Sequence, residues 1–122
     1  MTKENDHAGL FGLGQANTAY QQYFKGQSYL HSLVGAENEI DVHVANVTFE
    51  PGCRNNWHIH HHGFQILLVT SGEGWYQEAG KPAQKLRPGD VVTIHEGIKH
   101  WHGAAKDHWM SHIAITKGTS RS

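Results

Sequence analysis

Turn residues recur along this chain at short intervals and divide it into segments of strand length. Proline and glycine occur together in "EPGC", "AGKP" and "RPGD", and glycine without proline in "SGEG" and "HEG". Proline sets a φ of about −65° and glycine tolerates positive φ, so these are turn signals. The intervening segments are rich in β-branched and aromatic residues, which favour strands. We expect strands within 28–34, 40–49, 57–60, 65–72, 74–80, 83–88, 90–95, 100–105 and 109–116. This rhythm predicts an all-β fold.

The length of the chain limits it to one domain. Its 122 residues are 38% hydrophobic and 10% aromatic, which is enough for one apolar core and not for two. We predict a single domain over residues 1–122, with a core at about 28–116 and flexible ends at 1–14 and 117–122. The one helical candidate is "QANTAYQQYF", residues 15–24, where Asn17 or Thr18 would cap a short helix.

Charge and composition exclude several classes of partner. Ten basic and eleven acidic residues give a formal charge of −1, so no basic excess attracts nucleic acid or an anionic membrane. No apolar stretch reaches membrane-spanning length, and the first residues lack the apolar core of a signal peptide. The sole cysteine, Cys53, fits a reducing compartment and is expected to be a small, inert side chain. We therefore predict a cytoplasmic protein whose partners are a small-molecule substrate and further copies of itself.

Histidine is concentrated in the segment "WHIHHHGFQ", residues 57–65. Side chains two residues apart on a strand point the same way, so His58 and His60 face one side. Unbroken alternation would place Gln65 on the opposite face, but a turn or bulge at Gly63 would return it to the side of the histidines. His100 follows the glycine turn of "RPGDVVTIHEGIKHWHG". Three neutral imidazoles and an amide oxygen suit one divalent transition metal, with positions left open for substrate.

Two motifs in this part of the chain resemble those of the cupin family. The first family motif is G-x5-H-x-H-x(3,4)-E-x6-G, and residues 52–72 read G-CRNNW-H-I-H-HHGF-Q-ILLVTS-G. The second usually runs PGD-x3-apolar-PxG-x2-H-x3 and then Asn or a small residue, and residues 88–104 read PGD-VVT-I-HEG-IK-H-WHG-A. The resemblance covers about 51–105. It implies a double-stranded β-helix, the jelly-roll cupin barrel, with a metal held inside by His58, His60, Gln65 and His100.

The chain departs from the usual cupin pattern at two positions. Gln65 replaces the customary glutamate, and His95 replaces the proline. A neutral amide leaves the full double charge on the metal, which polarises substrate oxygens more strongly but is held less tightly. Glutamine here, with "GDVV", "KHWHGAA" and "SHIAI", is similar to small bacterial cupins that include manganese-dependent hydroxynitrile lyases and carboxymuconolactone-decarboxylase-type cupins. The resemblance implies manganese, with iron, nickel, zinc, cobalt or copper as alternatives, and a homodimer or higher oligomer.

Other polar residues are candidates for handling the substrate. In "WMSHIAIT", His112 shares a face with Ala114, so an inward imidazole near the metal would exchange protons. A hydrogen-bonded core histidine explains the pattern equally well, but the lyases carry a matching histidine, which favours the catalytic role. His102 shares a face with His100, and Asn55 precedes the first ligand. We assign both to substrate binding, with a rim position and a turn residue as their alternatives.

These residues support a leading functional hypothesis and two alternatives. The first is a Lewis-acid lyase that acts on a small hydroxy or carbonyl compound, as in cyanohydrin cleavage by a hydroxynitrile lyase. The second is a cupin dioxygenase with iron, nickel or copper, since three imidazoles with open positions also activate dioxygen. The third is a non-enzymatic cupin that binds a small ligand. The sequence favours an enzyme and leaves its substrate and native metal open.

Overall fold

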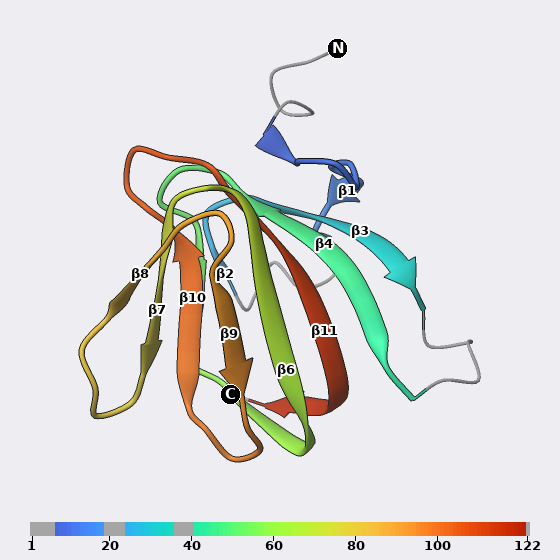
Figure 1. Cartoon of the computed structure of the whole chain (residues 1–122), viewed down its shortest axis with the longest axis vertical. Helices are drawn as coiled ribbons and strands as arrows, with labels where there is room; N and C mark the ends of the chain where they lie inside the picture. The colour runs from blue at the N-terminus through green and yellow to red at the C-terminus, as the bar shows by residue number, and fades with distance from the viewer. Residues whose placement is uncertain (1–6, 19–23, 36–40, 122) are drawn as a thin grey trace.

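Two antiparallel β-sheets pack face to face around the interior of the molecule (Figure 1). A computed structural model of the chain describes residues 7–18, 24–35 and 41–121. The first sheet has the strand order β1-β3-β4-β11-β6-β9, and the second has the order β2-β5-β10-β7-β8. From β4 onward the chain passes back and forth between the two sheets. This is the double-stranded β-helix, or jelly roll, that the sequence predicts.

The strands of the first sheet are β1 (Gln15–Ala16), β3 (Ser28–Val34), β4 (His43–Phe49), β6 (Ile59–Gly72), β9 (Val91–Ile94) and β11 (Met110–Arg121). Those of the second sheet are β2 (Phe24–Lys25), β5 (Arg54–Asn55), β7 (Gly74–Glu78), β8 (Gln84–Leu86) and β10 (His100–Ala104). Each segment that turn signals isolate in the sequence contains or overlaps one of these strands, and the predicted 28–34 coincides with β3.

The helix predicted over 15–24 is wrong at both of its described ends. Residues 15 and 16 form β1, which pairs with β3 through Gln15 opposite Leu30, and Phe24 begins β2. Residues 19–23 lie outside the described part of the chain. Pairing with a neighbouring strand outweighs the weak helical preference of a short polar segment.

A β-bulge interrupts the long strand β6 near its start. Phe64 lies opposite Lys117 and His61 opposite Thr119, so β6 contains one residue more than β11 over this stretch. His62 has a φ of 60°, a value that is uncommon for a residue other than glycine. The sequence predicts a turn or bulge at Gly63, and the left-handed residue is its neighbour His62. The extra residue reverses the alternation of β6, so His60 and Gln65 are both buried.

The apolar core fills one part of the interior and gives way to polar side chains along the same strands. Phe49, Leu67, Ile94 and Met110 are fully buried, and each such side chain contributes about 1.5–3 kcal/mol to folding. Toward the bulge the inward positions of β6 change from Leu67 to amide and imidazole side chains. The strands that form the core therefore also carry the polar site.

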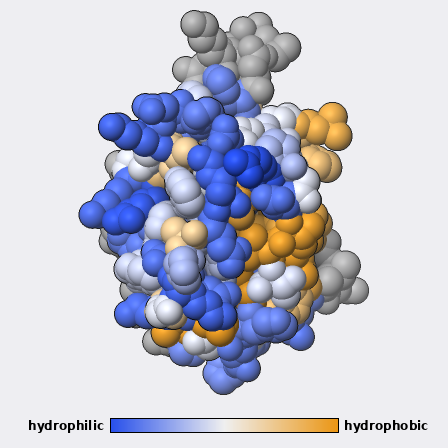
Figure 2. All heavy atoms as spheres, turned by 60° about the vertical axis from the view of Figure 1, so that its left-hand side comes forward, coloured by the Kyte–Doolittle hydropathy of each residue, from blue (hydrophilic) through white to orange (hydrophobic). Residues whose placement is uncertain are grey.

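The beginning of the described chain lies against the first sheet. Ala8 is fully buried, and the side-chain amide nitrogen of Asn46 donates hydrogen bonds to the carbonyl oxygens of Ala8 and Gly12. The predicted division into a core and flexible ends stays a prediction. Nowhere in the described ranges does a helix combine the length and apolar character needed to cross a membrane. Figure 2 shows a mostly hydrophilic flank beside one continuous apolar area.

Gly72, the last glycine of the first cupin motif, stands where a larger residue would strain the backbone and displace its neighbours. Its φ is +77°, and an added Cβ would lie 1.8 Å from the carbonyl oxygen of Trp109. Gly80 has a similar φ of +83° with open space around the same position. We expect Gly80→Ala to lower the free energy of unfolding by about 1–2 kcal/mol, and Gly72→Ala to lower it by about 3 kcal/mol or more. Urea unfolding of both variants measures the difference, and equal losses would contradict the close approach.

Candidate metal centre

The bulge in β6 brings two of the predicted ligands together. The Nε2 atom of His60 lies 3.1 Å from the Oε1 atom of Gln65. The side-chain nitrogen of Gln65 donates to the hydroxyl oxygen of Thr116 at 3.1 Å, which fixes the amide so that its oxygen faces His60. Two ligand atoms at right angles about an ion, each about 2.1 Å away, are separated by about 3.0 Å. The spacing of His60 and Gln65 fits that arrangement.

The other two predicted ligands are joined by a bridge between the backbones that carry them. His58 and His100 exchange N–H to carbonyl hydrogen bonds of 3.0 and 2.9 Å. Their ring centroids are 4.2 Å apart, and the ring of His60 lies 5.2 Å from His58 and 5.3 Å from His100. The structure thus brings the four residues predicted from the sequence into one cluster.

Backbone carbonyls fix the orientation of two of these imidazoles. Nδ1 of His58 donates to the carbonyl oxygen of Asn56 at 2.7 Å, and Nδ1 of His100 donates to that of Ile98 at 2.9 Å. A proton on Nδ1 leaves Nε2 with a lone pair, as in metal-binding histidines whose other nitrogen is held by an acceptor. Nε2 of His100 is buried and has no hydrogen-bond partner among the described residues. A divalent cation would satisfy this atom.

The electrostatic surroundings keep the imidazoles neutral. Burial lowers the pKa of His60 and of His100 to about 4, and the nearby His58 adds to both shifts. Burial also lowers the pKa of His58, against a smaller opposing effect of its hydrogen bond to Asn56. At pH 7 all three rings are in the neutral form that ligates metals.

A fourth histidine, His102, stands beside this cluster. Among the described residues, the ligand atoms of His58, His100 and His102 lie within 4.8 Å of one another, so distance alone selects a set that contains His102 in place of His60. However, Nε2 of His102 is 3.0 Å from the side-chain nitrogen of Asn55, and its Nδ1 is 3.3 Å from Nε2 of His112. Both ring nitrogens of His102 are therefore engaged by other side chains, whereas Nε2 of His60 faces a second predicted ligand atom, Oε1 of Gln65. We favour the set that contains His60 and Gln65.

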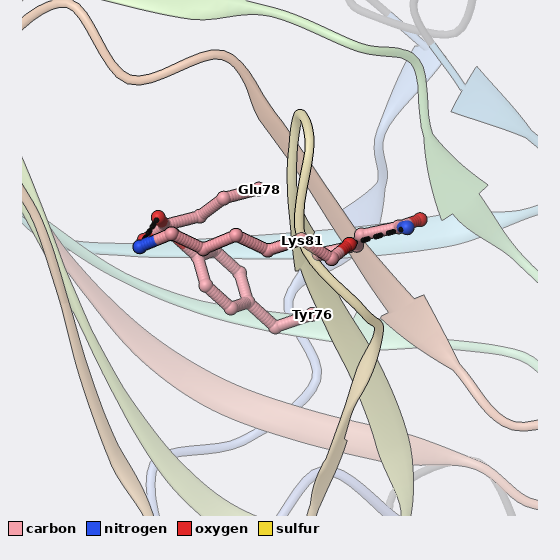
Figure 3. A network of polar contacts seen from close by, with 4 residues as sticks. Tyr76, Glu78 and Lys81 are labelled. Atoms are coloured by element: carbon pink, nitrogen blue, oxygen red, sulfur yellow. Dashed lines mark hydrogen bonds and ion pairs between the residues drawn. The ribbon is translucent and has the colours of Figure 1, made fainter.

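Behind His100, a buried tyrosine forms part of a polar network (Figure 3). The ring of Tyr76 lies 5.9 Å from that of His100, and its hydroxyl donates to the carboxylate of Glu78 at 2.8 Å. Glu78 forms an ion pair with Lys81 at 3.1 Å. Burial raises the pKa of Tyr76, so the phenol stays protonated and donates. The negative charge of Glu78 slightly opposes the effect of burial on the pKa of His100.

A cavity of about 710 Å³ adjoins the cluster. Its polar wall includes the predicted residues Asn55, His58, His60, Gln65, His102 and His112. Its apolar wall consists of Phe24, Leu30, Ala45, Val47, Phe49 and Ala114. No Asp, Glu, Lys or Arg lines it among the residues that the structure describes. The cavity therefore offers hydrogen bonds and apolar contact to a ligand, but no ion pair.

The structure also places residues at the cavity that the sequence interpretation does not single out. Thr116 lines it and holds Gln65, and the alternation of His112, Ala114 and Thr116 along one strand is the signal that would have identified it. Phe24, the last residue of the segment interpreted as a helix and the first of β2, also lines the cavity. No local pattern in the sequence predicts that Phe24 lines the cavity, because its position depends on pairing between strands far apart in the sequence.

Comparisons with known proteins agree with this geometry. The family model described as the cupin domain matches residues 45–115. The (R)-mandelonitrile lyase of Granulicella tundricola is 46% identical over 93 residues, which is 76% of this chain and 70% of that protein. A cupin-like protein of Thermotoga maritima has a crystal structure with a TM-score of 0.84 and 43% identity, covering 92% of this chain and 86% of that one. A DMSP lyase of Ruegeria pomeroyi, at 21% identity and a TM-score of 0.70 over 86% of this chain and 56% of its own, shares the fold.

The fold and the site define a small jelly-roll barrel with three histidines positioned to bind a metal ion. With the family match over more than half of its length and the relatives just described, this chain belongs to the cupin family. The resemblance inferred from the two motifs is confirmed. The roles of the individual site residues remain predictions.

We expect the double substitution His58→Ala, His60→Ala to abolish binding of a divalent metal, because it removes two of the three imidazoles in the predicted ligand set. Protein purified without a histidine tag should contain about one transition-metal ion per chain, and elemental analysis measures it. The matched control is His61→Ala, His95→Ala, which removes two histidines of the same region that lie outside the ligand set. Equal, substoichiometric metal in the wild type and both variants would contradict the assignment.

Proposed function

We propose that this chain is a metal-dependent lyase that cleaves a small, uncharged cyanohydrin into a carbonyl compound and hydrogen cyanide. The observation that carries the proposal is a cluster of four neutral ligand groups, three of which line a cavity without charged residues among those described. The relation to an (R)-mandelonitrile lyase at 46% identity supports this reaction. An uncharged substrate with an apolar substituent matches a wall that is partly amide and imidazole and partly aliphatic and aromatic.

His58, His60, Gln65 and His100 are the residues that would hold the metal, and we propose manganese as the ion, with iron, nickel, zinc, cobalt and copper as alternatives. None of these four groups is anionic, so the ion keeps its double charge. When bound, the metal supplies Lewis acidity toward a substrate oxygen. The chain itself contributes a closed environment: His60 is 3% exposed and His100 is 0% exposed, so water competes little for this position.

His112 is the residue that we propose to exchange protons with the substrate. It is fully buried, lines the cavity, and shares its inward face of β11 with Met110 and Ala114. Burial lowers its pKa to about 4, so the ring is neutral at pH 7. Cyanohydrin cleavage removes one proton from the hydroxyl group and adds one to cyanide. An imidazole that exchanges both leaves the protein unchanged at the end of a turnover.

Substrate binding is assigned to the walls of the cavity. Asn55 and His102, predicted from the sequence to contact the substrate, both line it. The apolar side, with Phe49 fully buried and Val47 nearly so, would take the hydrocarbon part of the substrate. Burial of an aromatic ring against such a wall gives affinity without charge.

The manganese-loaded protein should release cyanide from (R)-mandelonitrile faster than the metal-free protein, because the reaction depends on the charge of the ion. A colorimetric cyanide assay measures the rate. His112→Asn should lower kcat by about 100-fold or more while metal content stays the same, since it removes the proton carrier and no ligand. No rate above the metal-free control would exclude this activity, and oxygen consumption with a flavonol or diketone would then favour the dioxygenase hypothesis.

We also infer that the chain works as a homodimer or larger oligomer in the cytoplasm. Leu10, Phe11 and Val91 are 92%, 46% and 63% exposed, respectively, and Figure 2 shows a continuous apolar area on one flank. Large contiguous apolar surfaces are uncommon on monomers and mark contact sites. Cys53 is buried and forms no disulfide, which suits a reducing compartment.

Light scattering of the wild type should give at least twice the chain mass of 13.6 kDa, which is 27.2 kDa for a dimer. Val91→Glu, which places a charge on the exposed edge strand β9, should shift the mass toward the monomer. Lys99→Glu is the matched control, because it introduces the same side chain at another exposed position. A wild-type mass of 13.6 kDa at micromolar concentration would exclude the oligomer.

A further inference from the structure

A chain of hydrogen bonds runs through three buried side chains on the polar wall of the cavity. Asn55 of β5 contacts His102 of β10, and His102 contacts His112 of β11. Their exposed fractions are 7%, 3% and 0%. Because water reaches none of them well, the direction in which each hydrogen bond donates is set by the protein.

The side-chain amide of Asn55 can be oriented from its contacts. Its Oδ1 atom accepts a hydrogen bond of 2.9 Å from the backbone N–H of His102, so its Nδ2 atom is the one that lies 3.0 Å from Nε2 of His102. An amide nitrogen only donates. Nε2 of His102 must therefore accept and carry a lone pair, which places the proton of the neutral ring on Nδ1.

The same reasoning extends to the next ring. Nδ1 of His102 lies 3.3 Å from Nε2 of His112, so His102 donates and Nε2 of His112 accepts. The proton of His112 is then on Nδ1. Nδ1 of His112 is buried and has no hydrogen-bond partner among the described residues, so no donor there opposes a proton on it. A ring nitrogen that accepts a hydrogen bond carries no proton, so each of the two rings holds a single proton on its Nδ1.

We propose that Asn55 is a positioning residue that sets the direction of all the hydrogen bonds in this network, so that His112 carries its proton on Nδ1 while its Nε2 accepts from His102. Asn55 then acts through His102, and this role takes the place of the substrate contact that the sequence predicts for it. This inference rests on the proposed function for its meaning in catalysis, although the tautomers can be observed without it. In the neutral ring of His112 one nitrogen donates a hydrogen bond and the other accepts one. The direction set by Asn55 decides which of the two carries the proton.

The substitution Asn55→Asp tests this directly, because it keeps the shape and the Oδ1 acceptor but replaces the donor with a second acceptor. His102 should then carry a proton on Nε2. Long-range proton–nitrogen NMR spectra of the imidazoles, recorded on protein loaded with zinc, distinguish protonated from unprotonated ring nitrogens. Zinc has a filled d shell and does not broaden the signals. In the wild type we expect Nε2 of His102 to be unprotonated and Nδ1 of His112 to be protonated.

Asn56→Asp is the matched control, since it places the same charge beside the same cavity on the neighbouring residue, and it should leave the ring nitrogens of His102 as they are. In the cyanide assay, Asn55→Asp should lower kcat by about 100-fold or more with KM nearly unchanged and metal retained. A wild-type His102 protonated on Nε2, or an Asn55→Asp variant with unchanged nitrogen signals or unchanged kcat, would overturn the inference. Absence of cyanide release by the wild type would instead count against the proposed function. The nitrogen signals would still decide the direction of the hydrogen bonds from Asn55 to His112.

Discussion

The site depends on a single extra residue in the strand β6. Without the bulge at His62, His60 and Gln65 would lie on opposite faces of the sheet, because they are five positions apart and side chains alternate. With it, the Nε2 atom of His60 and the Oε1 atom of Gln65 approach to 3.1 Å. The same strand carries Leu67 and Val69 into the core. The bulge therefore lets inward-facing side chains on both sides of it, core residues after it and His60 before it, belong to one strand. The positive φ of His62 costs some folding free energy, and such backbone positions are often found at functional sites, where they hold side chains in a required geometry.

Strand periodicity made much of this arrangement accessible from the sequence. Alternation along β11 correctly places Met110, His112 and Ala114 on one buried face. The spacing of the motif locates His58, His60, Gln65 and His100, and the glycine after the histidines indicates a break in alternation. The placement of these residues was accessible because it depends on residues that are near one another in the chain, while their roles stay predictions.

Features that depend on pairing between distant strands were not accessible in this way. The hydrogen bonds between Asn55 and His102 arise because the short strand β5 pairs with β10, with Arg54 opposite Gly103. Gly103 leaves no room for a Cβ, which would lie 2.4 Å from the carbonyl oxygen of Cys53, so a glycine permits this close pairing. The same limit explains the segment at 15–24, whose described ends take their conformation from partner strands and not from local preference.

The charge balance of the site limits the chemistry that it can perform. The four ligand groups are neutral, and no described residue on the cavity wall is charged, so a bound divalent ion would be the largest charge in the cavity. An anionic substrate would already be stabilised by that charge before reaction. The further stabilisation of its transition state by the ion would therefore be small. A neutral substrate that develops negative charge on oxygen or cyanide gains most of its stabilisation during the reaction, which is the condition for catalysis. A glutamate at position 65 would reduce that difference by neutralising part of the ion's charge, so Gln65 makes the site better suited to substrates that enter uncharged.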